Sequence, residues 1–228
     1  TISGGKPVTG IWEKWTEAEG VYVTTLPESF RGTEIRQLFA EDSRAIRARE
    51  PDIGDITETW SVNTVDTNSR HWLTLQASIP AEWNNLTDVE IQFGNAETTS
   101  QQTVAALDAA NGRIDLTLPA ASADITWGYL ENALAFLDTP GEWYYDANAC
   151  RLYYYPLDGV DPNRQQIVVP VLEQLLSIDG TTDQPVKNLA FVGLQFCYTA
   201  WDMSAGTERR GIGSGFWTTV DNTGIIAP

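Results

Sequence analysis

The sequence predicts an all-β protein, and three observations support this fold class. Residues that favour strands, namely Thr, Val, Ile, Trp and Tyr, are abundant, whereas runs with the helical spacing of apolar residues are few. Short alternating or continuous apolar runs are separated by clusters of Gly, Pro, Asn and Asp. With 228 residues, 42% of them hydrophobic, the chain is long enough for one large or two small domains around an apolar core.

The chain opens with one short extended segment. Residues 1–10 contain several breaks at glycine and proline, and Trp12 and Trp15 follow three positions apart. Such an indole pair either caps the end of a fold or stands exposed to bind a sugar ring, and we favour the cap.

Residues 20–120 contain a series of short strand-like runs, which is typical of a small antiparallel sandwich or barrel. The expected strands are 21–26, 36–40, 44–48, 71–79, 88–94 and two strands within 99–119 that turn at Asn111 and Gly112. In the strand 88–94, alternation places Val89, Ile91 and Phe93 on one face of the sheet. The hairpin between 36–40 and 44–48 is expected to turn through a longer polar loop at residues 41–43.

Residues 121–160 combine a predicted short helix with an aromatic hairpin. Leucines recur at helical spacing within 129–137, and Pro140 and Gly141 stop the helix. Aromatic side chains then crowd two strands, 142–146 and 151–155. Flat rings both fill cores and stack on sugars, so both interpretations stay open. If the rings bind sugar, the candidates are Trp143, Tyr145, Tyr154 and Trp201.

Residues 161–228 change character again. The runs IVVPVLEQLLSI and NLAFVGLQFCYTAW are nearly continuous in apolar residues, as in strands that are covered on both faces. The tail after residue 206 is rich in glycine.

Charge and composition exclude several classes of partner and site. Acidic residues outnumber basic ones by 31 to 14, and a net charge of −17 repels nucleic acids and anionic membranes. No apolar run is long enough to cross a bilayer, and no leader precedes the first residue, so we predict no membrane association. His71 is the single histidine, which excludes a multi-histidine metal site. We predict no bound metal and no cofactor, although an all-oxygen structural calcium site remains possible. Cys150 and Cys197 are predicted to be free thiols.

Several motifs resemble a known group of proteins. The stretches ENALAFLDTPGEWYYD, RLYYYPLDG, VVPVLEQLLSIDG and PVKNLAFVGLQFCYTAW are similar to right-handed parallel β-helix proteins that degrade polysaccharides, among them several glycoside hydrolase families. The resemblance implies the first coils of a right-handed parallel β-helix with an inserted antiparallel sandwich or barrel lobe. The implied division is 1–12 for the first strand and cap, 20–120 for the inserted lobe, 121–160 for the helix and hairpin, and 161–228 for the start of the β-helix.

The resemblance also implies a function and a location. It predicts the N-terminal portion of a larger secreted protein, extracellular or periplasmic, that binds a polysaccharide or oligosaccharide and cleaves glycosidic bonds with paired carboxylates. The candidates for those carboxylates are Asp202, Glu208 and Glu131. A non-catalytic carbohydrate-binding module is the alternative, and a polysaccharide lyase of the same fold ranks lower.

Overall fold

The computed structural model describes residues 1–53, 59–77, 79–200, 209–212, 216–218 and 225–226. Within these residues the chain is all-β, and its helical segments are short 3-10 turns, which confirms the predicted class. The described part contains no helix long and apolar enough to span a bilayer. The chain divides into two compact units, the first made of residues 1–47 and 145–200 and the second of residues 48–144 with the described residues beyond 208.

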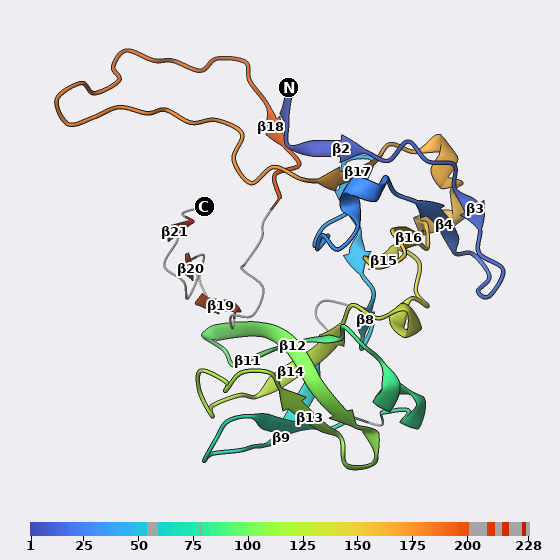
Figure 1. The fold of residues 1–228 in the computed structure, drawn as a ribbon. Coiled ribbons are helices and arrows are strands. Elements are labelled where there is room, and N and C mark those ends of the chain that lie inside the picture. The colour runs from blue at the N-terminus through green and yellow to red at the C-terminus, as the bar shows by residue number, and fades with distance from the viewer. Residues whose placement is uncertain (54–58, 78, 201–208, 213–215, 219–224, 227–228) are drawn as a thin grey trace. The chain divides into compact units, whose positions relative to one another are not determined.

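A closed antiparallel barrel forms the body of the second unit (Figure 1). Within the described residues, six strands close the ring in the order β11-β14-β9-β10-β13-β12, and β12 returns to pair with β11. The strands are β9 (Trp60–Val65), β10 (Trp72–Leu75), β11 (Glu90–Gly94), β12 (Thr98–Asp108), β13 (Arg113–Leu116) and β14 (Trp127–Glu131). Closure leaves the barrel no unpaired edge along these strands.

Alternation along the strands fills the barrel. In β10 and β13 every second residue is buried, as expected where one face of a strand points inward. Phe93 is 1% exposed and Ile91 is fully buried, opposite Leu130 of β14. The turn at Gly112 adopts φ 60°, a conformation that favours glycine. The inward face of 88–94 and this turn are both as the sequence predicts.

Further segments extend the second unit. They are β8 (Arg49–Glu50), β19 (Arg209–Ile212), β20 (Phe216–Thr218), β21 (Ile225–Ile226), η2 (Ala81–Asn85), η3 (Ala109–Asn111) and η4 (Leu134–Phe136). β8 pairs with β14, and β19 pairs with β12. The ring of Trp83 packs edge-on against Phe136, with 4.7 Å between ring centres, so η2 and η4 share a hydrophobic contact.

The helix predicted over 129–137 is wrong. Its first residues form β14, which closes the barrel between β11 and β9, and only η4 is helical. Asn132 then takes φ 68° and ends the strand. Leu130 is fully buried because it faces the barrel interior, so its spacing from the later leucines reflects two different environments. Tertiary pairing overrides the helical pattern here.

The first unit is built from short sheets (Figure 1). One sheet has the order β3-β4-β16-β15-β7, another has the order β2-β17-β5-β6, and β1 pairs with β18. Their bounds are β1 (Ile2–Ser3), β2 (Gly5–Pro7), β3 (Glu13–Lys14), β4 (Tyr22–Thr25), β5 (Phe39–Ala40), β6 (Ser43–Arg44), β7 (Ile46–Arg47), β15 (Glu142–Asp146), β16 (Arg151–Tyr154), β17 (Ile167–Pro170), β18 (Phe196–Cys197), η1 (Glu28–Phe30), η5 (Leu157–Gly159) and η6 (Pro162–Arg164). The division between the units falls within β15.

Two details of this unit differ from the sequence prediction. The strand expected at 21–26 is β4, but it pairs with β16 in the first unit and takes no part in the barrel. The hairpin of β5 and β6 turns through only Glu41 and Asp42, with Glu41 at φ 53°, so the loop is shorter than expected. The first difference arises because β16, the pairing partner of β4, lies far away in sequence.

The two ends of the first unit meet in a parallel ladder. Ile2 lies opposite Phe196, and Ser3 lies opposite Cys197. A further parallel bridge joins Leu172 to Thr199. The start of the chain therefore runs alongside residues near 196, with the free thiol of Cys197 in the second strand.

Candidate functional site

Three carboxyl groups of the second unit come together where β8 ends. Glu50 closes β8, Asp52 follows it, and Asp138 lies just after η4. Their oxygen atoms lie within 4.8 Å of one another. Glu50 and Asp52 are half-buried, whereas Asp138 is exposed. The arrangement places partly desolvated acids beside one that reaches solvent.

Burial and the neighbouring carboxylates raise the pKa of two acids of this cluster, Glu50 and Asp138. The pKa of Glu50 is raised from its ordinary 4.5 to about 7, mainly by burial and then by the charges of Asp52 and Asp138, while Arg49 opposes the shift. The pKa of Asp138 is also raised, first by burial and then by Asp52. A carboxyl group that titrates near neutral pH is suited to donate a proton.

Glu142, the first residue of β15, is the most deeply buried acid of this region. It is 1% exposed, and burial raises its pKa to about 8. The backbone N–H of Arg49 donates to its Oε1 over 3.1 Å, and the N–H groups of Asp138 and Thr139 approach Oε2 at 3.4 Å. Glu142 thus ties β8 to the loop before β15.

The surrounding groups hold the cluster in place. The hydroxyl of Thr139 donates to Oδ2 of Asp52 over 2.8 Å. Among the described residues, the buried Oδ1 of Asp52 has no hydrogen-bond partner. The guanidinium of Arg49 lies 3.5 Å from the ring centre of Tyr129 and donates through Nε to the Pro51 carbonyl over 3.0 Å. Arg49 is therefore fixed in place beside the acids, held by a ring and a backbone carbonyl.

The same three carboxyl groups are the described candidates for a metal site. Calcium takes six to eight oxygen ligands, so Glu50, Asp52 and Asp138 would supply part of a shell that backbone carbonyls and water complete. The donor set is all oxygen, in keeping with the structural calcium left open above, and calcium binding stays a prediction.

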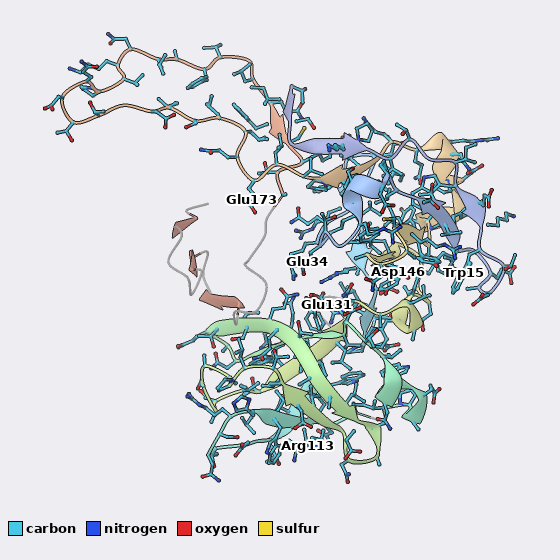
Figure 2. The ribbon with its side chains drawn as sticks, viewed as in Figure 1. Trp15, Glu34, Arg113, Glu131, Asp146 and Glu173 are labelled. Atoms are coloured by element: carbon cyan, nitrogen blue, oxygen red, sulfur yellow. The ribbon has the colours of Figure 1, made fainter. Side chains whose placement is uncertain are left out.

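Of the three carboxylates predicted from the sequence, Glu131 alone lies within the described residues. Glu131 of β14 is 7% exposed and accepts a hydrogen bond from the amide of Gln101, which also donates to Glu90 over 2.6 Å (Figure 2). This places Glu131 in a buried polar network of the barrel. Asp202 and Glu208, together with Trp201, lie outside the described residues.

The aromatic hairpin is a core element, which corrects the sugar-stacking interpretation. Trp143 and Tyr154 are 1% exposed and Tyr145 is 6% exposed, so these rings present no face to a ligand. The hydroxyl of Tyr145 donates to the Phe30 carbonyl over 2.7 Å, and Tyr154 packs edge-on against Trp12. These contacts follow the structural alternative, in which buried tyrosines use their hydroxyls on polar partners.

The acidic cluster was missed because its members are distant in sequence. Glu50 and Asp52 precede the barrel strands, whereas Asp138 and Glu142 follow them. The pairing of β8 with β14 and the hydrogen bond from the Ala48 N–H to the Trp143 carbonyl bring the two stretches together. No local spacing of acids in the sequence indicates this meeting.

A solved structure described as a glycoside hydrolase matches with a TM-score of 0.77 and 23% sequence identity, over 94% of this chain and 39% of that chain. This chain therefore shares a fold with part of that protein and spans about two fifths of its length.

A second comparison is narrower. Residues 117–157, which run from the end of β13 through the hairpin β15–β16, match the GH141 insertion domain. The match includes Asp138 and Glu142. None of the curated proteins compared matches the chain significantly.

Proposed function

We propose that this chain is part of a secreted glycoside hydrolase-like protein that acts on a polysaccharide or oligosaccharide. The observation that carries the proposal is the shared fold with a glycoside hydrolase over 94% of the chain, to which the GH141 insertion domain match over residues 117–157 adds a second link. The net charge of −17 favours neutral glycans over polyuronates, since like charges repel.

The proposal includes a right-handed parallel β-helix that extends beyond the described ladders. The parallel pairing of β1 with β18 and the bridge between Leu172 and Thr199 have the strand direction that such a stack requires. The backbone N–H groups of Val171 and Leu172 both donate to the Gly4 carbonyl, over 2.8 and 3.0 Å. Stacked coils bury their apolar residues against neighbouring coils, and the barrel would then be an insertion in the chain of such a stack.

Hydrolysis of a glycosidic bond needs one carboxyl group to protonate the leaving oxygen and a second to attack the sugar or to activate water. Glu50 meets the first requirement, because its raised pKa keeps it partly protonated at neutral pH. Asp138 lies in the same cluster and reaches solvent. The cluster has the short spacing of retaining enzymes, about 5 Å between carboxyl groups. Asp202 and Glu208 remain candidates from the sequence.

The test measures release of reducing sugar by the 228-residue chain on a panel of neutral and uronate polysaccharides, beside affinity electrophoresis in gels with the same polymers. If Glu50 is the proton donor, Glu50→Gln lowers release by 100-fold or more, the usual contribution of such a group. The matched control is Glu97→Gln, an exposed glutamate of the same unit. Asp138→Asn, Asp202→Ala and Glu208→Ala separate the remaining candidates.

Two outcomes contradict parts of the proposal. Undiminished release by Glu50→Gln would exclude Glu50 as the acid while leaving the class intact. A chain that neither releases sugar from any polymer nor is retarded by any of them would overturn the assignment to carbohydrates.

A non-catalytic carbohydrate-binding role is the second candidate, and one feature favours it. A pocket in the first unit, lined by residues of β3, β4 and β16, contains a single carboxylate, Glu13. Hydrolysis requires a pair of carboxyl groups, so this pocket is suited to binding alone. Retardation in affinity gels without any release of sugar would support this role.

A further inference from the structure

The pocket of the first unit exists because the chain leaves the sheet at Trp12. The register of β3 with β4 pairs Glu13 with Val23, and its continuation would place Trp12 opposite Thr24. Instead, the side chain of Asn163 hydrogen-bonds to both backbone groups of Trp12. It accepts from the N–H and donates to the carbonyl, each over 2.9 Å. The strand therefore separates from β4, and a pocket of about 240 Å³ opens beside Gly10 and Ile11.

The arrangement that opens the pocket is itself held in place. Asp161 accepts hydrogen bonds from the backbone N–H and the side-chain amide of Asn163, over 2.9 and 2.8 Å. These bonds orient the amide toward Trp12, whose ring is 4% exposed. The residues that hold this edge of the pocket open are therefore packed and hydrogen-bonded.

One buried polar group on the pocket wall lacks a partner. Thr24 lines the pocket and is 4% exposed, and its Oγ1 has no hydrogen-bond partner among the described residues. Gly10 stands directly against this hydroxyl, because a Cβ atom at Gly10 would approach Oγ1 to 2.4 Å. An unpaired buried hydroxyl costs free energy.

Two charges of opposite sign face the same pocket. Glu13 and Arg151 are exposed lining residues, and neither forms a salt bridge with another described residue. The guanidinium of Arg151 lies 5.3 Å from the ring centre of Tyr153, which packs edge-on against the half-buried Trp15 at 5.2 Å. Figure 2 labels Trp15 just beyond β3.

We propose that this pocket is a binding subsite for one neutral sugar unit of a glycan. A carboxylate accepts and a guanidinium donates hydrogen bonds, so Glu13 and Arg151 together match the hydroxyl groups of a sugar ring. The two charges cancel, which gives no preference for an ionic ligand, and the net charge of −17 disfavours a polyanion. The exposed Ile11 borders the pocket as an apolar surface for the ring's C–H groups. This inference rests on the proposed function and deepens it.

The test is isothermal titration calorimetry of the 228-residue chain with cello-, xylo- and manno-oligosaccharides as neutral probes and oligogalacturonates as the anionic probe. Arg151→Ala and Glu13→Gln should each weaken binding of the neutral probe by tenfold or more, because each removes a charge-assisted hydrogen bond. Arg44→Ala and Glu19→Gln change exposed residues of the same unit and should leave affinity unchanged. Thermal unfolding of all four variants checks that they fold as the parent does.

The possible results separate the subsite from the proposed function. If the parent chain binds a neutral probe and both pocket variants bind it as tightly, the subsite is wrong and the carbohydrate assignment stands. If only the oligogalacturonate binds, the preference for a neutral sugar is overturned. If the chain binds no probe and the polysaccharide panel is negative as well, the proposed function fails together with the subsite.

Discussion

The barrel of the second unit buries its apolar side chains, whereas the segment between β17 and β18 of the first unit exposes them. In the barrel, each strand from β9 to β14 has neighbours on both sides, and Phe93 is 1% exposed. Between β17 and β18, Phe191 is 50% exposed and Val192 is 85% exposed. Figure 1 shows this segment as a long excursion of the backbone, and no strand is named between β17 and β18. A closed antiparallel ring buries its own core, whereas this segment leaves its apolar side chains exposed.

The largest expected effect comes from exchanging a phenylalanine for alanine in each region. Phe93→Ala should lower the free energy of unfolding by about 3–5 kcal/mol, because it leaves a cavity inside the barrel. Phe191→Ala, the matched control, should change it by less than about 0.5 kcal/mol. Urea unfolding followed by fluorescence measures both. Equal losses would show that the segment after β17 packs in solution and would remove the contrast.

Glu142→Gln tests burial of charge in place of burial of apolar surface. The pKa of Glu142 is about 8 in the folded chain and close to its ordinary 4.5 when unfolded, so the folded state binds more protons between these values. The contribution of this carboxyl group to stability is therefore fully present at and below pH 4.5, and it is lost as the pH rises toward 8. The amide of the variant cannot ionise. The free energy of unfolding should therefore fall less in the variant than in the parent, by on the order of a few kcal/mol between pH 5 and 9.

The measurement for Glu142→Gln is the free energy of unfolding of parent and variant across that pH range. Glu97→Gln, at an exposed position, serves as the control and should follow the parent. Parallel curves for parent and Glu142→Gln would mean that the buried carboxyl does not set the pH dependence.

Gly4→Ala tests the parallel ladder that begins the exposed segment. An added Cβ would lie 2.8 Å from the Tyr198 carbonyl and 3.0 Å from the Leu172 carbonyl, and backbone atoms can yield only by moving. We expect a loss of about 1–3 kcal/mol and faster amide exchange at Ile2, whose N–H donates to Gln195. Hydrogen exchange read by NMR measures this, with the exposed Thr9→Ala as the control. Unchanged protection of Ile2 would argue against the ladder.

The smallest effect on stability is expected at the most exposed apolar side chain. Val192→Ser should shift the free energy of unfolding by less than about 0.5 kcal/mol, yet it should reduce self-association of the chain, because exposed apolar segments promote contacts between molecules. Sedimentation velocity at several concentrations measures the association. If the parent is monomeric and the substitution changes nothing, the exposed segment does not promote self-association.

Local features of the fold were predictable where one short stretch decides them. Alternation placed Ile91 and Phe93 inward, the Asn111–Gly112 pair marked a turn that needs positive φ, and the aromatic runs marked β15 and β16. The helix expected over 129–137 failed, because leucine spacing cannot tell a helix from a strand that continues into a 3-10 turn. Burial of the hairpin rings also depended on partners elsewhere in the chain.

By itself, the sequence determined the all-β class, the strands that carry their own alternation, and the net charge of −17. Only the tertiary structure decided that 127–131 closes a barrel, that β4 belongs with β16, and that Glu50 meets Asp138. The reason is physical: alternation and turn preference act between neighbours along the chain, whereas strand pairing and desolvation of acids depend on residues that only folding brings together.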